Sequence, residues 1–286
     1  MPELPEVEVV KQSLDKKIKF QKINKVVVRN RKLRFKVTKN FEFSLRNKII
    51  SNISRKSKYL IFHLKNKTYL IFHLGMSGTM HLVSKKNYTN TNLSFYGSSN
   101  LPKKHNHIIF FFNKYELIYN DPRRFGFAKI LKNKKKLETF FNIYGPEPLN
   151  RDFSSDYIFN YLKGKNKIIK SFLLDQKFVS GIGNIYSSEI LHYSKINPLK
   201  QAKKLSKQEI KKMKYFSKFV LNKAIKKGGS SIRNFKNIKG KAGNYQKEFK
   251  VYNRENLNCL DKSCFGKIIK KNISNRSTFF CNTCQK

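Results

Sequence analysis

The first six residues, Met-Pro-Glu-Leu-Pro-Glu, place a potential nucleophile beside carboxylates. The initiator methionine is usually trimmed before a small residue, and Pro2 would then be a free secondary amine with Glu3 next to it. A terminal amine titrates near pH 8, so part of it is unprotonated at neutral pH and can form a Schiff base with an electrophilic carbon. Glu3 is then a candidate proton shuttle. The alternative is an ordinary Met-Pro start, in which Glu3 and Glu6 only favour the first turn of a helix through its dipole.

The four cysteines of the chain lie close to its end and are spaced as metal ligands. Cys259 and Cys264 are separated by four residues, 16 residues follow, and Cys281 and Cys284 are separated by two. This spacing predicts a four-thiolate zinc ribbon with one structural Zn²⁺. Arg276 lies between the two pairs, at the expected tip of a hairpin. By itself it is a candidate functional residue or a solvated turn residue.

Three further motifs carry side chains suited to binding DNA or moving protons. Ser-Arg-Lys-Ser-Lys-Tyr contains Lys58, which is either a solvated amine or a positioned acid. His-Leu-Gly-Met-Ser-Gly presents Met76 between glycines, as core filler or as a wedge between bases. Asp-Pro-Arg-Arg-Phe-Gly offers Arg123, Arg124 and Phe125 on one turn. Arginine can hold a phosphate or a base edge while the ring stacks, although an ordinary charged turn with a core phenylalanine fits equally well.

The elements that must position these residues change character along the chain. Helical spacing follows residue 6, and short β-branched and aromatic runs then predict strands at 25–28, 59–64, 68–73, 79–83, 107–112, 115–120 and 127–131, typical of an antiparallel sandwich or barrel. The polar stretch 84–104 is expected to be a surface loop. Helices are predicted at 157–162, 168–174, 184–193 and 207–227, with the Gly-Ile-Gly-Asn turn at 181–184 able to bind phosphate. A Gly/Lys/Asn-rich loop is expected at 228–248.

The charge of the chain points to an anionic polymer as its partner. The 286 residues include 62 Lys and Arg but 17 Asp and Glu, which gives a formal net charge of +45 at pH 7. Nucleic acid is the obvious partner, and codon bias in an A/T-rich genome is a second source of the lysines. No apolar run is long enough to span a bilayer, and the first residues do not read as a signal peptide. We therefore expect a cytoplasmic protein.

Taken together, these motifs resemble one family, the formamidopyrimidine-DNA glycosylases. The start Met-Pro-Glu-Leu-Pro-Glu-Val-Glu, His-Leu-Gly-Met-Ser-Gly, Lys-His-Asn-His at 104–107, Asp-Pro-Arg-Arg-Phe-Gly, Gly-Pro-Glu-Pro-Leu, Gly-Ile-Gly-Asn-Ile-Tyr and the four cysteines match in order. The similarity spans essentially the whole chain. The related endonuclease VIII group shares the fold but usually lacks Leu4, so this residue favours the purine enzyme.

The resemblance implies a multidomain α+β fold. We expect an N-terminal antiparallel β-sandwich with flanking helices at 1–133, a linker at 134–150, a helix-two-turn-helix domain at 151–250 and a C-terminal β-hairpin zinc finger at 251–286. It also implies a monomer that acts on damaged double-stranded DNA, in a bacterial cytoplasm in association with the nucleoid.

The resemblance also implies roles for individual residues. Pro2 resembles the nucleophile that displaces the damaged base and forms a Schiff base, Glu3 the acid or base that opens the sugar, and Glu6 its support. Lys58 resembles the lysine that assists β-elimination, and Arg276 the arginine that assists δ-elimination. Met76, Arg123 and Phe125 are similar to the trio that fills the gap left by an everted nucleotide. Further DNA contacts are implied for His105, Arg124, Lys165, Lys170 and Asn184.

The predicted function is therefore base-excision repair. The enzyme would remove oxidised purines such as 8-oxoguanine and formamidopyrimidines, and cleave the abasic site by β,δ-elimination. The alternatives are an oxidised-pyrimidine glycosylase of the endonuclease VIII type and a zinc-stabilised nucleic-acid-binding protein without catalysis. Two departures from the family pattern concern the finger: its first cysteine pair usually encloses two residues instead of four, and a glycine usually stands where this chain has Asn275.

Overall fold

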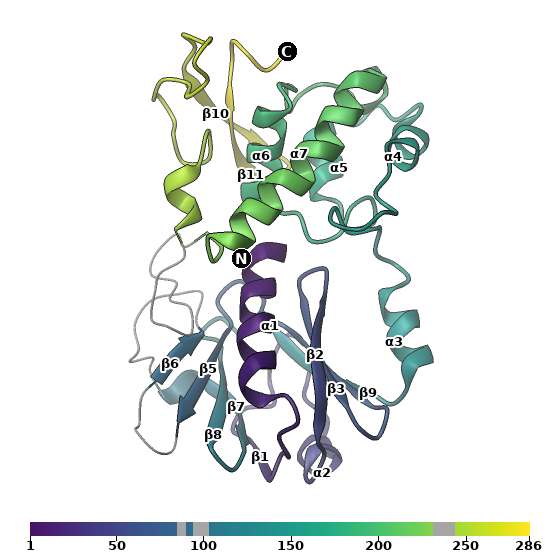
Figure 1. Cartoon of the computed structure of the whole chain (residues 1–286), viewed down its shortest axis with the longest axis vertical. Helices are drawn as coiled ribbons and strands as arrows, with labels where there is room; N and C mark the ends of the chain where they lie inside the picture. Colours follow the sequence, from purple (N-terminus) through teal and green to yellow (C-terminus); the bar gives the residue numbers. More distant parts are fainter. Residues whose placement is uncertain (85–89, 94–102, 231–243) are drawn as a thin grey trace. The chain divides into compact units, whose positions relative to one another are not determined.

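The computed structural model describes residues 1–84, 90–93, 103–230 and 244–286 (Figure 1). These residues form two compact units, one of Met1–Asn142 with Ile225–Gln246 and one of Ile143–Ala224 with Lys247–Lys286. Both predicted loops, 84–104 and 228–248, fall largely outside the described residues. Strand β6 (Asn90–Leu93) and the 3₁₀ helix η1 (Lys103–His105) are the described elements within the first. In the described part of the chain, no helix has the length and apolar character needed to cross a membrane.

The first unit is the predicted antiparallel sandwich. One sheet has the order β1 (Lys25–Val28), β7 (Asn106–Phe111), β8 (Tyr115–Asn120), β5 (Thr79–Ser84) and β6. The other has the order β2 (Ile50–Lys56), β3 (Tyr59–Leu64), β4 (Tyr69–His73) and β9 (Phe127–Leu131). Aromatic rings join the sheets, since Phe72 of β4 lies 6.0 Å from Phe110 and 5.4 Å from Tyr119 between centroids. Such contacts between inward-facing side chains are what hold a sandwich together.

Helix α1 (Leu4–Ile18) belongs to the same core. Val7, Val10 and Leu14 repeat at helical spacing and are buried with the strands of both sheets. At its far end, Asp15 Oδ1 accepts a hydrogen bond of 2.7 Å from the backbone N–H of Ile53 in β2. The helix is therefore held along its apolar face by the core and at its far end by this hydrogen bond. Helices α2 (Phe41–Leu45) and α3 (Lys134–Phe141) also belong to this unit.

The strand β2 and the helices α2 and α3 were not predicted from the sequence. β2 carries Asn, Ser, Arg and Lys side chains, so only Ile50 and Ile53 are buried along it. Its apolar pattern was too sparse to indicate a strand, although it pairs with β3 over its whole length. Helix α3 lies inside the stretch that the sequence predicted to be a linker.

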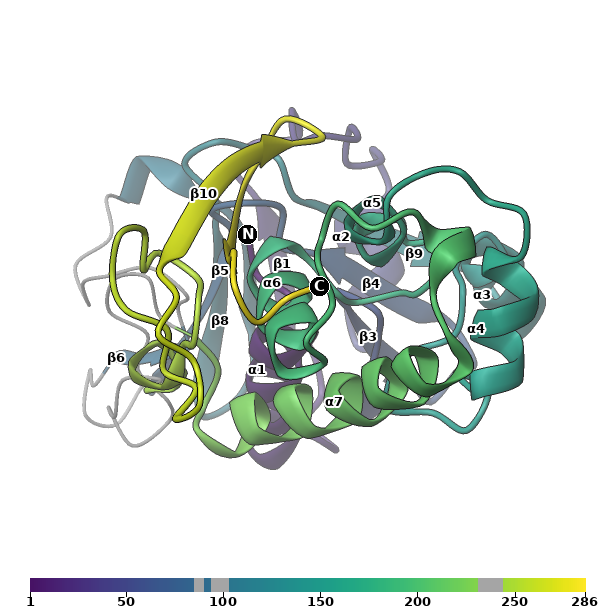
Figure 2. The ribbon, with the colours of Figure 1, turned by 90° about the horizontal axis from the view of Figure 1, so that it is seen from above.

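The second unit begins with helices, as predicted. These are α4 (Ser155–Leu162), α5 (Ile169–Leu174), α6 (Asn184–Tyr193) and α7 (Lys207–Lys226), with the 3₁₀ helix η2 (Ala202–Lys204) before α7. Figure 2 shows α7 starting beside α4 and passing α6. Lys207 lies over the ring of Phe159 in α4, and Phe216 and Phe219 each lie 5.6 Å from the ring of Tyr193 in α6. The strands β10 (Ile268–Ile273) and β11 (Arg276–Cys281) form an antiparallel hairpin, and β11 packs on α6.

A buried carboxylate ties α6 to the segment that leads into this hairpin. Glu189 is 0% exposed. Its Oε2 accepts the N–H of Lys250 at 2.8 Å, and its Oε1 accepts those of Val251 at 3.0 Å and Tyr252 at 2.9 Å. Three backbone donors are thus satisfied by one side chain in a place that water does not reach.

We expect Glu189→Gln to destabilise this unit. An amide presents N–H in place of one oxygen, so at least one buried backbone N–H faces another donor, which costs about 1–3 kcal/mol of unfolding free energy. Urea unfolding followed by circular dichroism measures the loss. Glu138→Gln, in an exposed helix position with only a 3.7 Å ion pair to Lys134, is the matched control and should leave the transition unchanged. An equal loss in both variants would contradict the assignment.

Candidate functional site

The predicted nucleophile and carboxylates lie at the start of α1. Pro2, Glu3 and Glu6 are all buried. Glu3 caps the helix, and its backbone N–H donates to Glu6 Oε2 at 2.9 Å. Glu6 Oε1 also accepts the backbone N–H of Ser230 at 2.8 Å and its hydroxyl at 3.0 Å. Glu6 therefore holds the helix start to a distant segment of the same unit, which suits a supporting role.

Gly229 shows how close this approach is. Its φ is +82°, and a Cβ there would lie 3.2 Å from Glu6 Cγ and Oε1. A left-handed backbone beside the carboxylate favours glycine. These contacts place Gly229 and Ser230 in the first unit, although the sequence predicted the whole range 151–250 to be one domain.

Lys58 follows a strained turn between β2 and β3 and is only 5% exposed. Ser57 has a positive φ of 55°, and its carbonyl accepts a 2.9 Å hydrogen bond from Arg55 Nη1. Arg55 Nε in turn donates to Glu8 Oε2 of α1 at 2.8 Å. The ion pair thus connects the turn that carries Lys58 with the helix that follows Pro2. Lys58 is therefore not a solvated surface amine.

Met76, Arg123 and Phe125 surround a cavity of about 750 Å³ in the first unit. Met76 is 39% exposed and Phe125 43% exposed, so neither is core filler. The Arg123 guanidinium lies 4.5 Å from the centre of the Phe125 ring, a cation–π contact that keeps the two side chains together. The other side chains that line this cavity are those of Met1, Lys32, Leu33, Arg34, His73 and Arg124.

His73 is a residue of this cavity that the sequence did not single out. The pKa of His73 is lowered to about 4. Burial is the main cause, and the positive charges of Lys58 and Arg34 contribute to the same shift. The ring is therefore neutral at pH 7, and its Nδ1 can accept the N–H of Gly75 at 3.1 Å. Arg34 lines the same cavity as His73, and Lys58 also lies close enough for its charge to act on the ring. Such a concentration of positive charge is suited to an anion.

His105 and Arg124 lie at the edge of the same region. His105 ends η1, and its carbonyl accepts the N–H of Asp121 at 3.1 Å. Arg124 has a positive φ of 56° and is exposed. Both residues thus belong to the loops around the turn 121–126, and their contacts with DNA remain predictions.

In the second unit, Arg276 is exposed at the tip of the β10–β11 hairpin. Ile273 pairs with Arg276, so Ser274 and Asn275 form a two-residue turn, with φ of 51° and 56°. Two positive φ values are characteristic of a type I′ turn, in which asparagine is well tolerated. Asn275 therefore suits the backbone conformation of this turn.

Helices α5 and α6 hold this hairpin. Asn184, the first residue of α6, donates from Nδ2 to the carbonyl of Ser277 at 2.8 Å, and the hydroxyls of Ser171 and Ser274 lie 3.0 Å apart. The glycine turn before α6 is shaped by Gln176, whose Oε1 accepts the N–H of Gly181 at 2.8 Å. Asn184 thus positions the strand that begins with Arg276.

The two predicted lysine contacts of this unit differ in exposure. Lys165 is exposed, directly after a turn at Gly164 with φ of +71°. Lys170 is 0% exposed, and its amine donates to the carbonyl of Asn184 at 3.1 Å and to Ser188 Oγ at 2.7 Å. The described contacts of Lys170 therefore stabilise the start of α6. Its proximity to a lesion remains a prediction.

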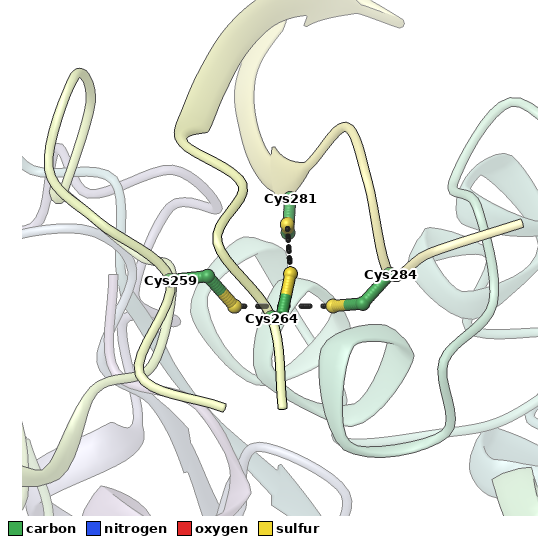
Figure 3. Close-up of side chains that lie close together, drawn as sticks. All are labelled: Cys259, Cys264, Cys281 and Cys284. Carbon is green, nitrogen blue, oxygen red and sulfur yellow. Dashed lines mark hydrogen bonds between the residues drawn. The ribbon is translucent and has the colours of Figure 1, made fainter. Parts of the chain in front are cut away.

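The four cysteines converge as predicted and could hold a metal ion (Figure 3). All four Sγ atoms lie within 4.8 Å of one another, with 3.8 Å between Cys259 and Cys284 and 3.6 Å between Cys264 and Cys281. A tetrahedral zinc with Zn–S bonds of about 2.3 Å requires sulfurs about 3.8 Å apart, whereas a disulfide bond is about 2.0 Å long. The donor set thus fits a thiolate metal site, with His192 Nε2 at 3.4 Å from Cys259 Sγ.

The longer first cysteine pair is accommodated by a local turn. Asp261 Oδ1 accepts the backbone N–H of Ser263 at 3.2 Å and its hydroxyl at 2.7 Å. Asp261 also forms an ion pair with Lys195, just beyond α6. Four residues therefore return Cys264 to the cluster, where two suffice in the usual pattern.

Comparison with known proteins agrees with this architecture. Residues 1–128 match the model of the formamidopyrimidine-DNA glycosylase N-terminal domain, and residues 144–236 match that of the formamidopyrimidine-DNA glycosylase H2TH domain. A formamidopyrimidine-DNA glycosylase of Wolbachia pipientis wMel is 41% identical over 100% of both chains, and one of Rickettsia bellii is 40% identical, again over 100% of both.

Solved structures of Lactococcus lactis Fpg have the same fold. A mutant in complex with a Fapy-dG containing DNA gives a TM-score of 0.88, with 34% identity over 100% of both chains. A complex with an abasic site containing DNA gives 0.87, with 34% identity over 99% of both chains. From the N-terminal helix to the hairpin with its four cysteines, the chain belongs to the formamidopyrimidine-DNA glycosylase family.

Proposed function

We propose that this protein is a base-excision repair enzyme that removes oxidised purines from duplex DNA and then cleaves the abasic site. One observation carries the proposal furthest: Met1 lines the same cavity as Met76, Arg123 and Phe125. The chain terminus therefore opens onto the surface that would receive a distorted duplex. After removal of Met1, the amine of Pro2 would stand at that cavity.

The reaction uses the Pro2 amine as nucleophile. Its nitrogen attacks C1′ of the damaged nucleotide and loses its proton, while the bond from C1′ to the base breaks and the base is protonated. The bond between C1′ and the ring oxygen O4′ then breaks with protonation of O4′, which opens the sugar and leaves an iminium at C1′. Glu3, the neighbouring carboxyl, supplies or accepts that proton. The resulting iminium makes the C2′ proton acidic, so its loss expels the 3′ phosphate, and a second elimination expels the 5′ phosphate. Lys58 assists the first elimination and Arg276 the second.

The enzyme must also extract the nucleotide, because C1′ of a stacked nucleotide is out of reach. Met76 and Phe125 are exposed apolar side chains that can occupy the vacated space. Arg123, held against Phe125, can contact the orphaned base. Phosphate contacts from His105, Arg124, Lys165 and Asn184 complete the proposed DNA interface, and the buried Lys170 is proposed to lie near the lesion pocket.

The four thiolates are proposed to hold one structural Zn²⁺, which would fix the hairpin that presents Arg276. We also propose the functional division that the sequence predicts: a catalytic sandwich at 1–133, a linker at 134–150, a helix-two-turn-helix domain at 151–250 and a zinc finger at 251–286. We further propose that the protein acts as a monomer, in the bacterial cytoplasm where the nucleoid lies.

Borohydride trapping tests the function directly. With a duplex that carries one 8-oxoguanine opposite cytosine, reduction of the iminium should link the DNA covalently to the peptide that begins at Pro2. The same duplex with guanine gives the background, and one with an oxidised pyrimidine tests the endonuclease VIII alternative. Binding without any adduct, in zinc-loaded protein lacking Met1, would favour a DNA-binding relative without catalysis.

A further inference from the structure

Asp121 is a fully buried carboxylate that the proposed chemistry does not use. It is 0% exposed and follows β8 directly, as the first residue of the Asp-Pro-Arg-Arg-Phe-Gly motif. An isolated charge in such a place is costly unless it is fully hydrogen-bonded. What Asp121 binds therefore indicates why a carboxylate occupies this position.

Four donors converge on its two oxygens. Oδ1 accepts the hydroxyl of Ser77 at 2.5 Å and the backbone N–H of Arg123 at 3.3 Å. Oδ2 accepts the hydroxyl of Tyr119 at 3.0 Å and the backbone N–H of Gly126 at 2.8 Å. Burial, together with the negative charge of Asp121, raises the pKa of Tyr119 well above its ordinary value, so this hydroxyl remains a donor.

These bonds join two separate turns. Ser77 belongs to residues 74–78, the turn that carries Met76, whereas Arg123 and Gly126 belong to residues 121–126, the turn that carries Arg123 and Phe125. The Ser77 hydroxyl is itself shared, since it also accepts the Arg123 N–H at 3.2 Å. Asp121 is thus the point at which both turns and the end of β8 meet.

The two turns also touch through their backbones. A Cβ on Gly75 would lie 2.4 Å from Gly126 N and 2.5 Å from Phe125 C, and one on Gly126 would lie 2.0 Å from the Tyr119 hydroxyl. No side chain fits in either place without a shift of the backbone. The turns therefore form one packed body with the carboxylate inside it.

We propose that Asp121 is a positioning residue that locks the two turns together, so that Met76, Arg123 and Phe125 enter the duplex as one preorganised wedge. This inference rests on the proposed function, in which these three side chains fill the gap. Because Asp121 is 0% exposed, it would act through the two turns and not by contact with DNA or with the reacting atoms. Substitution of Asp121 should therefore slow reactions in which a nucleotide must be extracted from a stacked duplex. It should not slow reactions on DNA without such a stack.

A carboxylate is required because each oxygen faces one backbone N–H, and backbone donors cannot rotate away. In Asp121→Asn, the amide nitrogen replaces either Oδ1 or Oδ2. This amide nitrogen is a donor, so it meets another donor in either orientation: the N–H of Arg123 if it replaces Oδ1, and the N–H of Gly126 if it replaces Oδ2. One turn must shift in both cases, although the side chain has nearly the same size.

The test compares two substrates for Asp121→Asn. Excision of 8-oxoguanine from a duplex requires the wedge, whereas strand cleavage at an abasic site in single-stranded DNA requires the nucleophile but no gap filling. We expect duplex excision to fall roughly tenfold to a hundredfold, the equivalent of one unsatisfied buried donor. Cleavage of the single strand should stay close to the unsubstituted protein's rate. Circular dichroism at the assay temperature verifies that the variant is folded.

Two further variants keep the test decisive. Ser77→Ala leaves the carboxylate in place and removes only the hydroxyl that bridges the turns, so it should show a smaller but equally selective loss. It decides the question if Asp121→Asn does not fold. Glu138→Gln, which removes an exposed carboxylate of α3 in the same unit, is the matched control and should spare both activities.

Other outcomes would overturn the proposal. An equal loss on both substrates would mean that Asp121 only stabilises the fold, and no loss on either would mean that the turns need no lock. The double variant Met76→Ala with Arg123→Ala separates this inference from the proposed function. If that variant excises normally from the duplex, gap filling by these side chains is wrong. If it is impaired while Asp121→Asn and Ser77→Ala are not, only the role of Asp121 is wrong.

Discussion

A chain that keeps any residue ahead of Pro2 is expected to lose base excision and strand cleavage, while it still binds duplex DNA. In such a chain the Pro2 nitrogen is a tertiary amide, which has no basic lone pair and cannot form an iminium. We expect a fall of about a thousandfold or more, as for removal of a covalent nucleophile. Cleavage of an abasic-site duplex, followed on a denaturing gel, measures the effect.

Pro2→Gly is expected to lose strand cleavage as well, even with a free terminus. Glycine lacks the ring that fixes φ, and its primary amine is held less rigidly at the start of α1. The buried cap between Glu3 and Glu6 does not involve the Pro2 ring, so the helix should still form and DNA binding should be largely kept.

The control for the blocked terminus uses the same polypeptide. A protease site placed directly before Pro2 allows the extension to be removed after purification, and cleavage of DNA should then return. Duplex affinity should be equal before and after removal. Full strand cleavage by the extended protein, with the extension verified by mass spectrometry, would overturn the Schiff-base mechanism.

Much of this fold could be predicted from the sequence because its signals are local. The strands at 25–28, 115–120 and 127–131 were placed at their observed bounds, since turns separate short β-branched and aromatic runs. Helix α6 was also placed correctly, after the glycine turn that its start requires. The four cysteines needed only their spacing, because thiolates so close in sequence have few other uses.

The features that the sequence left open or did not indicate depend on contacts between distant residues. Lys58 lies among other cations in the sequence, and the sequence alone does not show that it is buried. Its turn is tied to α1 by the ion pair between Arg55 and Glu8, which are 47 residues apart. Asp121 could be recognised as part of a motif, but not as an acceptor for Ser77, 44 residues away. His73 likewise becomes notable only when Lys58 and Arg34 lie near it. Composition and periodicity cannot encode such pairings.

Removal of the metal from the cysteine cluster should abolish tight DNA binding, because little else stabilises the finger. Its apolar core consists of Val251, Cys259, Ile268, Phe279 and Cys281, and two of these residues are candidate metal ligands. Structural zinc commonly contributes about 10 kcal/mol or more of apparent binding energy, and small finger domains unfold without it. We therefore expect Cys281→Ser to lose zinc, to unfold the β10–β11 hairpin and to bind lesion duplex about a hundredfold more weakly or worse.

The measurements separate metal loss from general unfolding. Metal analysis should give one zinc per chain in the unsubstituted protein and less in Cys281→Ser, and a chelator should reproduce the loss of binding. Zinc added back to the chelated protein should restore it, whereas Cys281→Ser should stay inactive. The β signal of the sandwich should persist throughout, since its core draws on Phe62, Phe72 and Phe110 and not on the cysteines.

Because α6 holds β11 through Asn184 and Ser277 only when the hairpin is formed, the loss should extend to the placement of Arg276. Undiminished binding by a zinc-free protein would show that the thiolates serve another purpose.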